Sequence, residues 1–178
     1  MFSASLSGDF GKLNAIGKRV ASLGEPAAFR EIAQSVGKEA LELVDKGFAR
    51  ESDPYGVPWY RKSYPDGRSI LQGASGKLRK SFQITYVSPD AVTVGSGLAR
   101  ALFAQGGTGL YGPTKARIRA KGKAMRFTGS NGSTLFRRSV KGQQQRRMLP
   151  VKWMSSAPWN RAINVRIKAV FGVKLRRI

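Results

Sequence analysis

The sequence predicts an α+β fold, in which a small antiparallel sheet packs with N-terminal and C-terminal helices and carries a long basic loop or extended hairpin. Three observations predict it. Apolar residues recur every three or four positions near both ends, apolar and polar residues alternate over 82–95, and bulky apolar residues are sparse over 107–147. Because 178 residues with 41% hydrophobic content suit one core, we expect a single domain over 1–178.

Two helices are expected over residues 9–49. Apolar residues from Phe10 to Leu23 share one helical face, and Gly24-Glu25-Pro26 interrupts the pattern. Pro26 suits the first turn of a second helix, where its missing N–H breaks no hydrogen bond. We interpret the apolar stripe of this second helix, which ends near residue 49, as core packing.

A structural loop is expected next, where two prolines and a glycine end the helix. Its defining residues are Asp53, Pro54, Gly56 and Trp59. We interpret Trp59 as the packing anchor of this loop, and a joint to a neighbouring subunit is the alternative. Residues 63–81, with a turn at Pro65-Asp66-Gly67, predict a short helical or irregular connection.

The second half is expected to begin with a β-hairpin over 82–95 and a short helix over 98–105. Residues 107–147 predict a basic flexible loop or an extended hairpin that stays mobile until a partner binds it. A strand is expected over 149–153. Ser156 is placed to cap a final helix over 157–171, which we expect to end at Gly172.

The residue types present argue against catalysis. The chain has no Cys and no His, which excludes thiolate and imidazole chemistry and most zinc and transition-metal sites. Asp53 and Asp66 are explained by turns, and Gly106 to Gly109 lacks the strand and helix of a phosphate-binding loop. We therefore predict no catalytic, cofactor-binding or metal-binding residues, and no enzyme.

No membrane partner is expected. The first residues lack a cationic segment followed by an apolar core, and no apolar run approaches the roughly 20 residues that span a bilayer. We expect the protein to be made and used on the cytoplasmic side.

The charge is the strongest functional signal. Residues 1–90 hold 13 Lys/Arg and all 10 Asp/Glu, whereas residues 91–178 hold 19 Lys/Arg and no acid. Since the second half cannot neutralise itself, we expect a partner with negative charge, either nucleic acid or an acidic protein face; a merely solvated surface is the alternative. The candidate contact residues are Lys115, Arg117, Arg119, Lys121, Lys123, Arg126, Arg137, Arg138, Arg146 and Arg147.

The order of several short motifs resembles the virion morphogenesis or tail completion proteins of tailed bacteriophages, including those of Mu-like phages. Asp53–Trp59 is similar to the family's Asp-Pro-x-Gly-x-x-Trp loop, and Ile70-Leu71 with Ser75–Ser81 to its Ile-Leu and Gly-x-Leu-x-x-Ser signature. Ala104–Gly107 resembles its Ala-x-x-His-Gln-x-Gly element, with Ala104 in place of the histidine, and Arg147–Pro150 resembles its Arg-Pro-Phe-Leu. The motifs cover most of the chain.

The resemblance implies a structural virion protein that forms a ring at the head–tail junction, as a tail completion or terminator protein or a neck connector, and lets DNA pass. It implies a homo-oligomer, with a hexamer favoured and a dodecamer possible, next to neck and tail-tube proteins, and assembly in the host cytoplasm. The alternative is a basic nucleic-acid-binding protein of the ribosome- or nucleoid-associated type.

Overall fold

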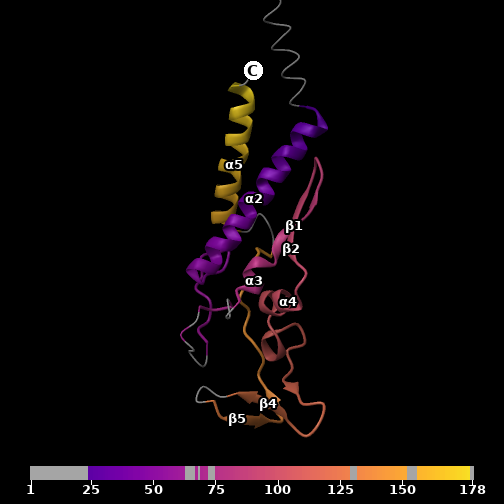
Figure 1. The fold of residues 1–178 in the computed structure, drawn as a ribbon, viewed down its shortest axis with the longest axis vertical. Coiled ribbons are helices and arrows are strands. Elements are labelled where there is room, and N and C mark those ends of the chain that lie inside the picture. Colours follow the sequence, from indigo (N-terminus) through magenta and orange to yellow (C-terminus); the bar gives the residue numbers. More distant parts are fainter. Residues whose placement is uncertain are drawn as a thin grey trace, which may run out of the picture.

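The computed structural model describes residues 24–62, 67, 69–71, 75–128, 132–151 and 156–176. This part of the chain is elongated, with helices α2 (Pro26–Arg50) and α5 (Ala157–Arg176) towards one end and strands β4 (Met125–Thr128) and β5 (Thr134–Arg137) at the other (Figure 1). Its helices and two-stranded antiparallel sheets confirm the predicted α+β class.

Helix α2 buries one apolar stripe against the rest of the body. Pro26 stands in its first turn, and the helix ends where Glu51 adopts a left-handed backbone (φ 51°) and donates its N–H to the Gly47 carbonyl. This confirms the second predicted helix; the first, over residues 9–23, lies outside the described residues. The buried apolar positions of the stripe are Ala28, Ile32, Ala33, Val36, Ala40, Val44 and Phe48.

The predicted hairpin is formed by β1 (Phe82–Val87) and β2 (Val92–Ser96), with Ile84 opposite Val94 and a bulge before Tyr86. The turn is closed by hydrogen bonds between Ser88 and Ala91. One face of the hairpin packs on α2 at Gly37, where a Cβ would lie 2.8 Å from side-chain atoms of both Ile84 and Val92. A side chain at position 37 would therefore fit only if Ile84 and Val92 shifted, so the close approach of hairpin and helix favours glycine there.

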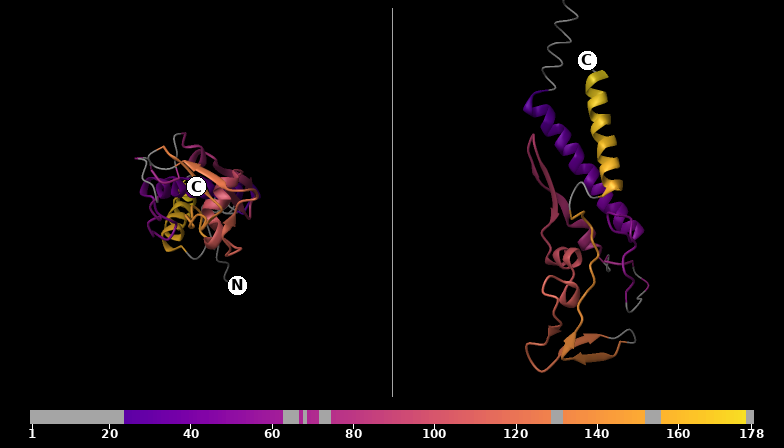
Figure 2. Two further views of the ribbon diagram at one scale, coloured as in Figure 1. Left: turned by 90° about the horizontal axis from the view of Figure 1, so that it is seen from below. Right: turned by 180° about the vertical axis from the view of Figure 1, so that it is seen from behind.

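Helix α5 runs beside α2, as both views from the side show (Figures 1 and 2). It starts after Ser156, whose hydroxyl accepts a 3.4 Å bond from the Trp159 N–H, and it buries Trp159 and Ile163. The helix continues to Arg176, past Gly172, where the sequence predicted its end. A glycine costs a helix about 1 kcal/mol but does not terminate it.

The described parts of residues 107–147, which are 107–128 and 132–147, form an extended hairpin rather than an open loop. After a single 3₁₀ turn, η1 (Gly109–Tyr111), strand β3 (Ile118–Arg119) pairs with β6 (Ser139–Val140), and β4 pairs with β5. The sequence predicted either a flexible loop or an extended hairpin, and the structure has the hairpin. Its mobility before a partner binds stays a prediction. We call residues 113–142 the basic arm and residues 143–149 the strap.

The expected strand over 149–153 is not formed by residues 149–151, and the remaining two positions lie outside the described residues.

The ladder of the basic arm is interrupted once. Ala120 donates its N–H to the Arg138 carbonyl, whereas Met125 pairs with Arg137, the neighbouring residue on the returning strand. Residues 121–124 therefore loop out of the ribbon. Strands β4 and β5 lie across the foot of the molecule (Figure 2, right).

The core lies where α2, α5 and the residue 52–59 loop meet. Phe48 is fully buried, with the ring of Trp59 edge-on to it at 5.4 Å and that of Phe82 at 6.1 Å. Ala104 of helix α4 (Ala99–Gly106) and Met148 of the strap complete this cluster. The core thus includes segments from both halves of the chain.

Gly37→Ala should destabilise the protein by about 1–2 kcal/mol, because overlap with Ile84 and Val92 outweighs the better helix propensity of alanine. Gly172→Ala is the matched control: a Cβ there meets nothing within 4 Å, so that variant should be about 0.5–1 kcal/mol more stable. Urea unfolding monitored by circular dichroism measures both. Stabilisation of similar size in the two variants would contradict the tight contact between α2 and the hairpin.

Candidate interaction surfaces

The Asp53 side chain organises the predicted structural loop. Its Oδ1 accepts hydrogen bonds from the backbone N–H groups of Tyr55 and Val57, both at 2.9 Å. The Asp53 N–H in turn donates to the Val57 carbonyl at 2.8 Å, and Gly56 supplies a positive φ of 88°. Turn chemistry therefore fully accounts for Asp53.

Three hydrogen bonds connect this loop to distant parts of the chain. The Ser156 hydroxyl donates to the Pro54 carbonyl at 2.5 Å, and the Tyr55 hydroxyl accepts from the Val151 N–H at 3.1 Å. The Trp59 indole donates to the Arg147 carbonyl at 3.0 Å. Trp59 is only 5% exposed and packs edge-on against Phe48, which leaves it almost no surface for a neighbouring subunit.

The side chain of Gln105 clamps the strap to the end of α4. Its Oε1 accepts hydrogen bonds from the N–H groups of Met148 (2.8 Å) and Leu149 (3.1 Å), and its Nε2 donates to the Leu149 carbonyl at 2.6 Å. A primary amide is suited to this because it carries an acceptor and two donors on one plane. The sequence analysis included Gln105 only as part of the Ala104–Gly107 motif. The one feature that could have indicated its role is its position next to the glycines that end the helix.

The strap and the residues after α4 are held together along their backbones. Arg146 donates its N–H to the Ala104 carbonyl at 2.7 Å, and Thr108 donates to Gln143 at 2.9 Å. At the root of the basic arm, Leu110 donates to the Lys141 carbonyl at 2.8 Å. We call the unit formed by residues 52–59, 104–107 and the strap the joint.

Arg146 and Arg147, two of the predicted contact residues, belong to the joint. The Arg146 guanidinium donates from Nε to the Tyr60 carbonyl at 3.1 Å, and burial lowers its pKa. Arg147 donates to the Gln145 side chain at 3.0 Å and is partly buried. The structure thus separates these two from the other candidates and gives them contacts within the chain.

The other eight candidates all lie exposed on the basic arm, together with Lys141, which the sequence prediction did not include. Lys121 and Lys123 stand on the looped-out segment 121–124. The arm carries nine Lys/Arg and no Asp/Glu. The exposed candidates are Lys115, Arg117, Arg119, Lys121, Lys123, Arg126, Arg137 and Arg138.

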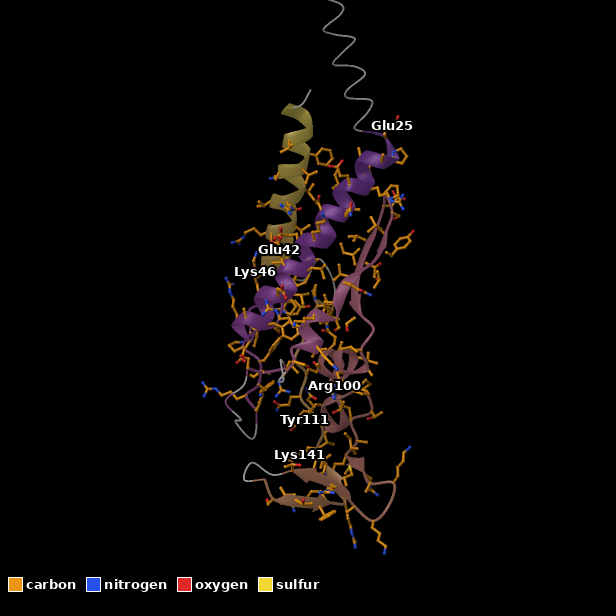
Figure 3. The ribbon with its side chains drawn as sticks, viewed as in Figure 1. Glu25, Glu42, Lys46, Arg100, Tyr111 and Lys141 are labelled. Carbon is orange, nitrogen blue, oxygen red and sulfur yellow. The ribbon has the colours of Figure 1, made fainter. Side chains whose placement is uncertain are left out.

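Helix α2, which carries four acidic residues, and the acid-free basic arm lie towards opposite ends of the molecule. In Figure 3, the labels of Glu25 and Glu42 lie beside α2, and the label of Lys141 lies near the other end, at the basic arm. The carboxylates of α2 face basic neighbours: Asp45 accepts a 2.7 Å bond from Arg79 Nε, which raises the pKa of Arg79, and Glu39 lies 3.9 Å from Arg166 of α5. The arm has no such neighbours of its own.

Among the described residues, no group of three potential ligands is placed to hold a metal ion. Within the same part of the chain, no helix combines the length and apolarity needed to cross a membrane.

Comparison with protein-family models, with curated protein sequences and with solved structures finds no match for this chain.

Gln105→Ala should lower the free energy of unfolding by about 2–3 kcal/mol, because it removes three hydrogen bonds and leaves backbone groups of the strap without partners. The matched control is Gln34→Ala, at an exposed position of α2, with an expected effect within about 0.5 kcal/mol. Chemical denaturation measures the difference between them. If the two variants are equally stable, the Gln105 clamp does not hold the joint.

Proposed function

We propose that the protein is a structural virion protein of a tailed bacteriophage and forms a ring at the head–tail junction through which DNA passes. It acts there as a tail completion or terminator protein, or as a neck connector, next to neck and tail-tube proteins. In this role it catalyses no reaction and uses no cofactor. Assembly takes place in the host cytoplasm.

The observation that carries the proposal is the composition of the joint. Three motifs that resemble those of tail completion proteins, Asp53–Trp59, Ala104–Gly107 and Arg147–Pro150, are far apart in the sequence but meet there. Each motif alone has a turn or packing explanation. A fold that needs all three at once explains why they occur together.

A ring requires two different surfaces on each subunit, because its interfaces are head-to-tail. Within the described chain, β1 and β2 pair only with each other, so neither outer edge of the hairpin has a strand partner. Helix α4 also presents Leu102 (70% exposed) and Phe103 (50% exposed) to solvent. Six copies match a sixfold tail tube and are favoured over the twelve of a portal-side ring.

Salt should strengthen the ring. Each copy carries a formal charge of +22, so copies repel one another at low ionic strength, and the Debye length falls from about 10 Å at 0.1 M salt to about 3 Å at 1 M. We expect light scattering and negative-stain microscopy to show a ring of six or twelve copies whose fraction rises with salt. A monomer at every salt and protein concentration would contradict the proposal.

Leu102→Asp tests the α4 surface in the same assay. It should lower the ring fraction, because a charge enters an apolar contact, and leave the unfolding temperature unchanged. Val165→Asp on α5, where Val165 is 63% exposed, introduces the same charge at a similarly exposed site and should leave the ring intact. Equal ring fractions in both variants would exclude α4 from the interface.

The second candidate is a basic nucleic-acid-binding protein of the ribosome- or nucleoid-associated type, which the acid-free arm favours. Such a protein would form no ring at any salt concentration. It would also bind RNA or DNA stoichiometrically, with an affinity that falls steeply as salt rises.

A further inference from the structure

The basic arm is not neutralised within its own chain. Nine Lys/Arg and no acid lie between residues 113 and 142. In the described part of the chain, the polar contacts of these cations are to neutral groups, such as the 3.4 Å bond from Arg117 to the Ser139 hydroxyl. Cations held this close together on an exposed ribbon favour a ligand that brings several negative charges at once.

A second copy of the chain does not supply those charges. Each copy has 32 Lys/Arg against 10 Asp/Glu, so every added copy raises the total positive charge. Several of the carboxylates are also already engaged on α2, where Asp45 pairs with Arg79 and Glu39 lies near Arg166. A different, polyanionic molecule would therefore neutralise the arm better than a second copy.

The cations point to both faces of the arm. In the β4–β5 ladder Arg126 stands opposite Phe136, and the next pair, Met125 opposite Arg137, projects to the other face because neighbouring side chains of a strand alternate. Lys121 and Lys123 add charge beside the ribbon, on the looped-out segment. A flat acidic protein face would reach the cations on only one side of such a ribbon. A groove that carries negative charge along both of its walls can reach the cations on both sides.

A groove of this kind exists in duplex DNA. Its major groove is about 12 Å wide, admits a two-stranded β-ribbon and is bordered on both sides by phosphates. Isolated two-stranded ribbons are only marginally stable in water, but the bond from Leu110 to Lys141 fixes the root of this one, and the strap that follows it is part of the joint. The arm is thus held away from the body in a form that enters such a groove.

We propose that the basic arm is a DNA-binding element that enters the major groove of duplex DNA and contacts the phosphates on either side. The bound charge is the phosphate backbone, so binding tolerates changes of sequence. The inference goes beyond the proposed ring, since a monomer and a ring subunit carry the same arm.

The test compares two variants with equal net charge. The arm variant carries Lys121→Gln, Lys123→Gln, Arg126→Gln and Arg137→Gln. The control variant carries Arg30→Gln, Lys38→Gln, Arg161→Gln and Lys168→Gln, at exposed positions of α2 and α5. All eight positions are exposed, so both variants should keep the unfolding temperature and circular dichroism spectrum of the parent protein.

Binding is measured by fluorescence anisotropy on a labelled duplex of about 20 base pairs over a range of salt concentrations. The slope of log K against log salt should shrink by about 0.9 for each phosphate that the variant no longer neutralises, and so by about two to four in the arm variant. At about 100 mM salt, the arm variant should bind at least about tenfold more weakly than the parent, and the control variant within about threefold of it. Equally weakened binding in both variants would show that overall charge, not the arm, binds DNA.

Two further probes identify the partner class. The unmodified chain should bind the duplex more tightly than a single strand of the same length, and more tightly than polyglutamate of the same total charge. Tighter binding of the single strand would overturn the groove assignment, and tighter binding of polyglutamate would assign the arm to an acidic protein. The binding measurement does not depend on ring formation. A monomer that binds DNA through the arm would overturn only the proposed ring. A ring whose arm variant binds DNA as well as the parent would overturn only the DNA-binding role of the arm.

Discussion

The contact on which the rest of the structure depends is the Gln105 amide bound to the backbone of Met148 and Leu149. It fixes the strap against α4, and the strap carbonyl of Arg147 then accepts the Trp59 indole. Since Trp59 packs edge-on against Phe48 at the centre of the core, one side-chain amide connects the hydrophobic core to the return path of the basic arm. Removing this amide would weaken the hold on the strap, which the backbone bonds from Thr108 to Gln143 and from Arg146 to Ala104 would then carry alone with Trp59.

This arrangement keeps two incompatible surfaces apart. Every acidic residue of the chain lies outside the arm, and several are paired on the body, whereas the arm carries only positive charge. If the arm folded back onto α2, its cations would be neutralised there and could not bind a partner. Backbone hydrogen bonds along residues 104–110 hold it at the far end of the molecule instead. The proposed ring and the proposed DNA contact both depend on this separation.

The elements that follow from local pattern were predictable from the sequence, and those that follow from distant contacts were not. The apolar stripe of α2 and the alternation from Phe82 onwards identified their elements because each pattern lies within one segment. Arg146 resembled the arm cations in sequence, but its burial beside Tyr60 depends on residues more than 80 positions away. The continuation of α5 past Gly172 was missed because glycine signals helix ends only statistically.

Hydrogen exchange by mass spectrometry, on the full chain with and without duplex DNA, tests the central claim most directly. Amides of the joint should be protected in both states, since they are hydrogen-bonded within the fold. New protection on adding DNA should be confined to residues 113–142. Protection gained mainly over α2 and α5, or exchange in the joint as fast as in an unfolded chain, would contradict an arm that the joint holds in place to contact DNA.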